Sequence, residues 1–117
     1  MGMWDFEAWD NDSAADWFGD LMDTTGLRDT WVQTMQEAVA EDELHEFERP
    51  RAALWLFAQL GRTYIWPIDH IEGDLDLCLN VADKILALDY LPEEAPEFLE
   101  LVKRDRDAIA KRKRPPT

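Results

Sequence analysis

The sequence has a single cysteine and no long apolar segment. Cys78 cannot form a disulfide within the chain, which is typical of proteins from a reducing compartment. No apolar run approaches the roughly 18 residues that a membrane-spanning helix needs. Carboxylates interrupt the first residues, where a secretory signal would need a basic stretch followed by an apolar one. We therefore expect a cytoplasmic protein without a membrane segment.

The motifs of common active sites are also missing. The chain has no Gly-rich phosphate-binding loop and no dinucleotide-binding fingerprint. Its two histidines, His45 and His70, stand near carboxylates, but their spacing matches neither a zinc site nor an EF-hand loop. Cys78 falls in the apolar stripe of an expected helix, where a thiol behaves as a small core residue. The sequence therefore predicts no cofactor, no metal and no catalytic residue. A metal-dependent enzyme built on His45 or His70 is the least favoured alternative.

Basic residues are scarce except near the end of the sequence. The net charge is −14, and residues 1–102 contain 24 Asp and Glu against 5 Lys and Arg. Residues 103–117 reverse this balance, with 7 Lys and Arg against 2 Asp. A strongly negative body repels nucleic acid and anionic membranes, so we expect it to bind neither directly. A protein with a basic face would be attracted instead.

Apolar residues are plentiful and follow helical spacing. They make up 46% of the chain and include six tryptophans, enough for the core of one domain. Asn11 can cap a first helix and Gly26 can end it. The apolar residues between them recur every three or four positions, so we expect them to face the core together. They are Ala14, Trp17, Phe18, Leu21 and Met22.

Four further helices are expected. The second covers residues 27–40, the third starts near Pro50 and ends at Gly61, the fourth covers residues 74–88, and the fifth starts at residues 91–94. The third is apolar all round, which indicates a helix surrounded by others. Residues 41–48 are interpreted as a charged connector and residues 63–67 as an extended link with packed aromatics.

The expected fold is therefore all-α. It is a single compact domain of four to five helices over residues 1–110, with an aromatic N-terminal latch. A basic C-terminal tail, residues 111–117, is expected to fray and to cap the last helix. The alternative for this tail is intramolecular docking onto the acidic helix face or contact with an acidic neighbour.

The opening stretch, MGMWDFEAWDNDSAADW, combines three tryptophans with several carboxylates. It resembles the start of a bacterial family known only as domain of unknown function 4259, whose members begin Met-Gly-x-Trp-Gly and reach Asn-Asp and then Asp-Trp. The positions that match are Met1, Gly2, Trp4, Trp9, Asn11, Asp12, Ala14, Asp16 and Trp17, while Asp5 and Glu7 replace family glycines. The Ala-rich helix that ends at Gly61 is also similar. The resemblance implies an α-helical fold and a cytoplasmic bacterial or phage origin, and it brings no catalytic residue.

The aromatic residues before Asn11 have a structural interpretation. They can fold back over the first helix as a hydrophobic staple and seal one end of the core. Burying one aromatic side chain stabilises a fold by roughly 2–3 kcal/mol. We therefore interpret this stretch as a latch rather than as a binding site.

Two groups of acidic residues are the candidate partner-binding residues. The first group recurs along one side of the first helix and the second follows the second helix. They are Asp12, Asp16, Asp20 and Asp23, and Glu41, Asp42, Glu43 and Glu46. Such surfaces can cover a basic active site or nucleic-acid channel on another protein.

We therefore expect a non-enzymatic protein-binding module, most concretely an immunity- or antitoxin-like inhibitor of a basic protein partner. In a second interpretation the chain is a structural or scaffolding subunit that self-associates through apolar surface, and its acidic residues serve solubility alone. The sequence leaves the oligomeric state and the identity of the partner open.

Overall fold

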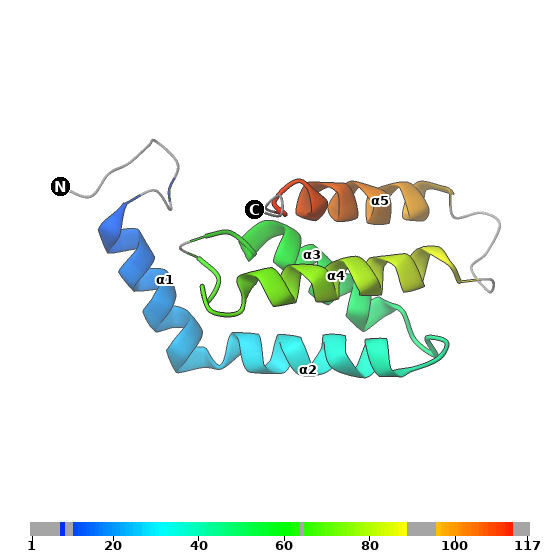
Figure 1. The fold of residues 1–117 in the computed structure, drawn as a ribbon, viewed down its shortest axis with the longest axis horizontal. Coiled ribbons are helices and arrows are strands. Elements are labelled where there is room, and N and C mark those ends of the chain that lie inside the picture. Colours follow the sequence, from blue (N-terminus) through cyan, green and yellow to red (C-terminus); the bar gives the residue numbers. More distant parts are fainter. Residues whose placement is uncertain (1–7, 9–10, 64, 89–95, 114–117) are drawn as a thin grey trace.

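Five helices form the regular structure of the residues that the computed structural model describes, which are 8, 11–63, 65–88 and 96–113. They are α1 (Asp12–Thr25), α2 (Leu27–Ala40), α3 (Glu48–Leu60), α4 (Ile71–Leu86) and α5 (Pro96–Ala110). α3 and α4 contact each other, and each also contacts both α2 and α5. α1 contacts α2 alone among the helices and leads away from the other four (Figure 1). The prediction of a single all-α domain is confirmed.

The core lies among α2, α3, α4 and α5, and its centre is aromatic. The rings of Trp31 and Phe57 are stacked, with centroids 5.4 Å apart. Trp66 meets both rings edge-on, at 4.9 Å from Trp31 and 5.0 Å from Phe57. The indole Nε1 of Trp31 also donates a hydrogen bond of 2.8 Å to the carbonyl oxygen of Ala53. This aromatic cluster therefore joins α2, α3 and the segment before α4.

The ends of the first two helices follow from local sequence, as predicted. The side-chain oxygen of Asn11 accepts a hydrogen bond of 2.8 Å from the backbone N–H of Ala14, which caps α1. Gly26 has a φ of 62°, a left-handed conformation that suits glycine, and it ends α1 and begins α2. The expected range of the second helix, residues 27–40, is confirmed.

Two expectations about the middle of the chain are wrong. The fourth helix begins at Ile71 rather than at residue 74, so Asp74 lies within its first turn, where its side chain forms a buried ion pair with Arg28. The segment 63–67 is not extended: the backbone N–H groups of Ile65 and Trp66 both bond to the carbonyl oxygen of Arg62 and form turns. The expected packing of its aromatics is confirmed for Trp66, whose side chain is buried.

Some expectations concern the two ends of the chain and the segment before α5. The N-terminal latch and the start of the fifth helix at residues 91–94 lie outside the described residues, as do residues 114–117 of the tail. Two residues of the tail contact other parts of the chain: Arg112 donates to carbonyl oxygens at the end of α3, and Lys113 forms an ion pair of 3.2 Å with Asp76 of α4. No helix in the described ranges has the length and apolarity to cross a membrane.

Arg112 caps the C-terminal end of α3. Its Nη1 donates to the carbonyl oxygens of Phe57, at 3.1 Å, and Gly61, at 3.3 Å, and its Nη2 donates to that of Ala58. Burial, and to a lesser extent the neighbouring charge of Arg62, lower the pKa of this guanidinium. A cation from the end of α5 therefore satisfies carbonyl groups that a helix end leaves without partners.

Replacing Arg112 by methionine keeps the apolar stem and removes these donors. We expect the free energy of unfolding to fall by about 1–2 kcal/mol, since each replaced bond involves a charged donor. Urea denaturation measures this change. The exposed neighbour Lys111, replaced by methionine, is the control and should change stability by less than about 0.5 kcal/mol. An equal effect of the two replacements would contradict the capping role.

Candidate functional site

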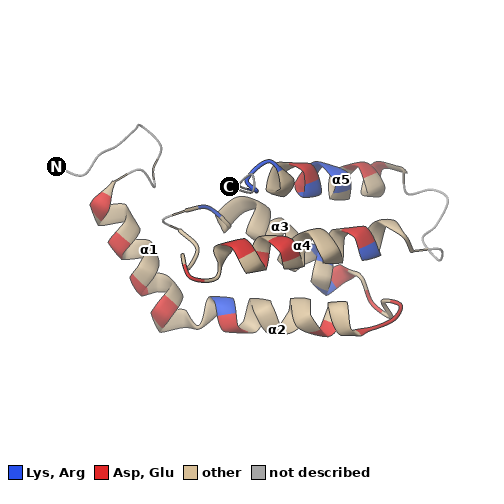
Figure 2. Ribbon diagram, viewed as in Figure 1, with Lys and Arg blue, Asp and Glu red and all other residues tan. Residues whose placement is uncertain are grey.

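The four aspartates of α1 form an exposed acidic ridge, which we define as Asp12, Asp16, Asp20 and Asp23. Spacings of four, four and three residues place them on one side of the helix, and all four are exposed. Figure 2 shows them as a series along α1. Among the described residues, no Lys or Arg lies within ion-pair distance of any of the four carboxylates. Their negative charge therefore faces solvent, and no Lys or Arg of the described ranges compensates it.

Trp17 stands beside this ridge and is 60% exposed. The expectation that it faces the core with Met22 is wrong. Because α1 contacts α2 alone among the helices, its buried side is narrow and only Met22 is fully buried. The indole of Trp17 packs edge-on against Phe18, with ring centroids 5.1 Å apart. Asp20 lies about one helical turn from Trp17, so a large aromatic and a carboxylate are presented together.

The second acidic group lies in the loop between α2 and α3. Asp42, Glu43 and Glu46 are exposed and Glu41 is half-buried. Two of these carboxylates have local partners: Glu41 accepts from the backbone N–H of His45 at 3.2 Å, and Glu46 lies 3.5 Å from the Nε of Arg49. This loop is therefore partly compensated, unlike the ridge.

The structure does not bring the two acidic groups together. The acidic ridge precedes the first residue of α2, and the acidic loop follows its last residue, about 20 Å away along the helix axis. Figure 2 shows the two groups at opposite ends of α2. They are two separate surfaces, so a single small contact cannot use all eight residues.

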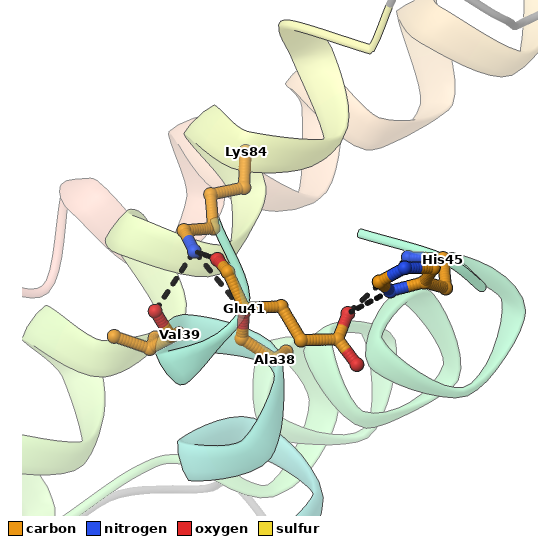
Figure 3. Close-up of polar contacts among 5 residues, drawn as sticks. All are labelled: Ala38, Val39, Glu41, His45 and Lys84. Carbon is orange, nitrogen blue, oxygen red and sulfur yellow. Dashed lines mark hydrogen bonds and ion pairs between the residues drawn. The ribbon is translucent and has the colours of Figure 1, made fainter. Parts of the chain in front are cut away.

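Lys84 holds the base of the acidic loop, a role that sequence reasoning missed. Its Nζ donates to the carbonyl oxygens of Ala38, at 3.2 Å, Val39, at 2.8 Å, and Glu41 (Figure 3). A cation of α4 thereby caps the C-terminal end of α2. One signal was present in the sequence: the expected second helix has no basic residue in its last turn.

The histidines form no metal centre with their neighbours. His45 Nδ1 lies 3.6 Å from the Oε2 of Glu41, and both side chains are shown in Figure 3. In the part of the chain that the structure describes, no three His, Cys, Asp or Glu side chains gather closely enough to hold a metal ion. His70 is exposed and immediately precedes α4.

Cys78 lies in the core, as expected. Its side chain is fully buried in α4, and burial, with a smaller effect of the Asp74 charge, raises the pKa of its thiol. The thiol therefore stays protonated and is a poor nucleophile.

Asp74 is the more deeply buried of two buried carboxylates among the described residues, the other being Asp105, and sequence reasoning placed it wrongly at a helix start. It lies between Arg28 at the start of α2 and the indole of Trp66, and it bonds to both. Arg28 and Trp66 thus occupy both oxygens of the Asp74 carboxylate, so this group offers nothing to a ligand.

A comparison of the chain with protein-family models, curated proteins and solved structures gave no match.

Proposed function

We propose that the protein is a non-enzymatic binding module whose acidic ridge receives the basic face of another protein. The observation that carries this proposal is the exposure of the four ridge carboxylates with no Lys or Arg of the described chain beside them. Carboxylates that a fold does not use internally remain available to a partner. α1 also leads away from the other helices, so a partner can reach the ridge (Figure 1).

Electrostatics and apolar contact have different roles in such a complex. The ridge and the net charge of −14 attract a basic protein over distances up to the Debye length, about 8 Å at physiological salt, and this raises the association rate. Solvent-exposed ion pairs contribute only about 0–1 kcal/mol each, so lasting affinity needs an apolar anchor. Trp17 supplies one, because exposed tryptophans frequently dominate binding energy.

Apolar surface also lies on the other side of the ridge. A hollow of about 290 Å³ between α1 and residues 65–68 is lined by Gly19 and Met22 together with Ile68, which is largely exposed. The ridge is thus bordered by apolar groups, which suits a contact with a charged centre and apolar flanks.

Inhibition is the most specific form of the proposal. If the partner's basic face is an active site or a nucleic-acid channel, covering it would block its substrate, as an immunity or antitoxin-like protein does. The proposal places the protein in the cytoplasm, together with such a partner. We also propose that the chain is related to domain of unknown function 4259, whose opening residues 1–17 resemble.

Charge reversal of the ridge tests the proposal. We propose to isolate proteins that co-purify from the native host with the wild type, with Asp16→Lys/Asp20→Lys and with Glu97→Lys/Asp107→Lys. The last variant reverses two exposed acids of α5 and changes the net charge equally. The expected result is a basic protein recovered with the wild type and the α5 variant, and at least about tenfold less with the ridge variant.

Equal recovery with the ridge variant would contradict the proposal. A third variant, Asp42→Lys/Glu43→Lys, reverses two exposed residues of the acidic loop. Because the loop lies at the far end of α2, we expect this variant to recover the partner as well as the wild type does. If only this loop variant failed to recover the partner, the binding site would be the acidic loop and not the ridge.

A further inference from the structure

A single residue joins α1 to the other helices. Gly26 ends α1 and begins α2, with a φ of 62° and a ψ of 24°. Hydrogen bonds along the backbone keep each helix rigid, so a change in the angle between α1 and α2 must occur at this residue. Glycine adopts a wider range of φ and ψ than any other residue. The junction can therefore bend without disturbing either helix.

Few interactions hold α1 against the rest of the fold. Met22 is its one fully buried residue, and Phe18 is partly buried against the core. Among the described residues, its side-chain hydrogen bonds are local: the hydroxyls of Thr24 and Thr25 donate to carbonyl oxygens of the preceding turn, and Thr25 accepts from the N–H of Leu27. No ion pair joins α1 to another helix in the described ranges. A helix held this weakly is able to move as a unit.

The hollow of about 290 Å³ gives α1 a place to move into. It separates α1, which lines it with Ala15 and Gly19, from residues 65–68. Ile68, on the far side of the hollow, is 59% exposed. No atom of another described segment lies within 4 Å of the point where a side chain at Gly19 would begin. The side of α1 that faces residues 65–68 thus consists of small residues with open space in front of them.

We infer that α1 is a movable arm that rotates about Gly26 and closes onto residues 65–68. The structure shows the open position (Figure 1). In the closed position Ala15 and Gly19 pack on Ile68, which removes apolar surface from water and fills the hollow. This gain is offset by the freedom of motion that α1 loses, so we expect both positions to be populated.

The position of the buried contact suits such a rotation. α1 has 14 residues and is about 21 Å long, so a rotation of about 15° displaces its first residue, Asp12, by about 5 Å. Met22 lies about one turn from Gly26 and moves by only about 1.5 Å. Its flexible side chain can follow this small shift and remain buried. Closing therefore fills the hollow without breaking the contact that holds α1.

The acidic ridge and Trp17 belong to α1 and move with it. Closing therefore changes the direction in which both face relative to the other four helices. A partner that binds one position more tightly than the other would shift α1 towards that position. The motion is a property of the fold, so it does not depend on the proposed function.

Double electron–electron resonance of the full chain measures the motion directly. Spin labels at Ser13→Cys on α1 and Gly73→Cys on α4 occupy exposed positions, while the buried, protonated thiol of Cys78 does not take a label. We expect two distances that differ by about 5 Å. Labels at Gln36→Cys and Asn80→Cys, on α2 and α4, are the control and should give one distance. A single distance for the first pair, as narrow as that of the control, would overturn the inference.

Filling the hollow tests where α1 closes. Gly19→Leu places a side chain in the hollow and should hold α1 open, so that only the longer of the two distances remains. Asp20→Leu changes the next residue, which is exposed and does not line the hollow, and both distances should persist. Leucine favours helices, so neither replacement should unfold α1. Two distances in the Gly19 variant, or the loss of one in the Asp20 variant, would overturn the inference.

Discussion

Replacing Asp74 by alanine is expected to lower the free energy of unfolding by about 3–5 kcal/mol. This effect and the effect of replacing Trp31 are the two largest that we predict. The carboxylate is only 3% exposed. Its Oδ2 accepts from the Nε of Arg28 at 2.9 Å and from the indole Nε1 of Trp66 at 2.8 Å, and its Oδ1 accepts from the Nη2 of Arg28 at 2.8 Å. Alanine would leave three donor N–H groups, two of Arg28 and one of Trp66, and the charge of Arg28 without their partner.

The same geometry favours the charged form of Arg28. The hydrogen bond with Asp74 raises the pKa of Arg28 further above its ordinary value. The guanidinium fork and the carboxylate are joined by two parallel bonds, an arrangement that is stronger and more directional than a single contact. Because Arg28 is the second residue of α2, this pair fixes the start of α2 against α4.

Thermal and urea denaturation measure the effect, with Asp76→Ala as the control. Asp76 is two residues further along α4, is exposed and pairs with Lys113, so its loss should cost less than about 1 kcal/mol. Arg28→Met/Asp74→Leu removes both charges and should be more stable than Asp74→Ala alone, since no buried charge is left unpaired. If Asp74→Ala and Asp76→Ala were equally stable, the ion pair would not have the structural role that we assign to it.

Replacing Trp31 by alanine is expected to lower the free energy of unfolding by about 3–5 kcal/mol as well. Trp31 is 3% exposed and contacts Phe57 and Trp66 at the centre of the core. The replacement removes a large buried surface, leaves a cavity between three elements and breaks the hydrogen bond to the carbonyl oxygen of Ala53.

Near-ultraviolet circular dichroism and urea denaturation measure this second effect. The signal of the packed tryptophans should weaken together with the loss of stability, since Trp66 loses its edge-on contact with Trp31. Trp31→Phe keeps one ring and should cost less. Trp17→Ala, at an exposed position, is the control and should change stability by less than about 1 kcal/mol. A Trp31 variant as stable as this control would contradict the placement of the core.

These two sites also determine where the acidic ridge lies. α1 contacts α2 alone among the helices and is connected to it through Gly26, two residues before Arg28. The ridge is therefore positioned by the start of α2, which Arg28 and Trp31 hold against the rest of the core. Variants that loosen this corner should weaken binding through the ridge even though none of the ridge carboxylates is changed.

Local sequence was sufficient to predict much of the fold. The cap at Asn11, the left-handed Gly26 and the limits of α2 depend on residues within a few positions of one another. Apolar spacing also identified Met22 as a core residue. The acidic ridge was predicted as a series on one side of a helix, and its exposure agrees with that prediction.

Contacts between distant segments were not predictable in the same way. Asp74 and Arg28 are 46 residues apart, and Arg112 is 51 to 55 residues from the carbonyl groups it caps. Periodicity likewise shows which side of a helix is apolar but not how many helices cover that side. Trp17 and Trp55 were therefore expected to be buried, although α1 has one neighbour and α3 leaves a groove open.

The most direct test of the central claim, that the acidic ridge binds a basic protein, is the salt dependence of affinity for the co-purified partner. Isothermal titration calorimetry should show that the wild type binds about tenfold or more weakly when NaCl rises from roughly 0.05 M to 0.3 M. Asp16→Lys/Asp20→Lys should bind far more weakly at low salt and lose most of that dependence, while Glu97→Lys/Asp107→Lys should resemble the wild type. Equal affinity and equal salt dependence for the ridge variant and the wild type would contradict the claim.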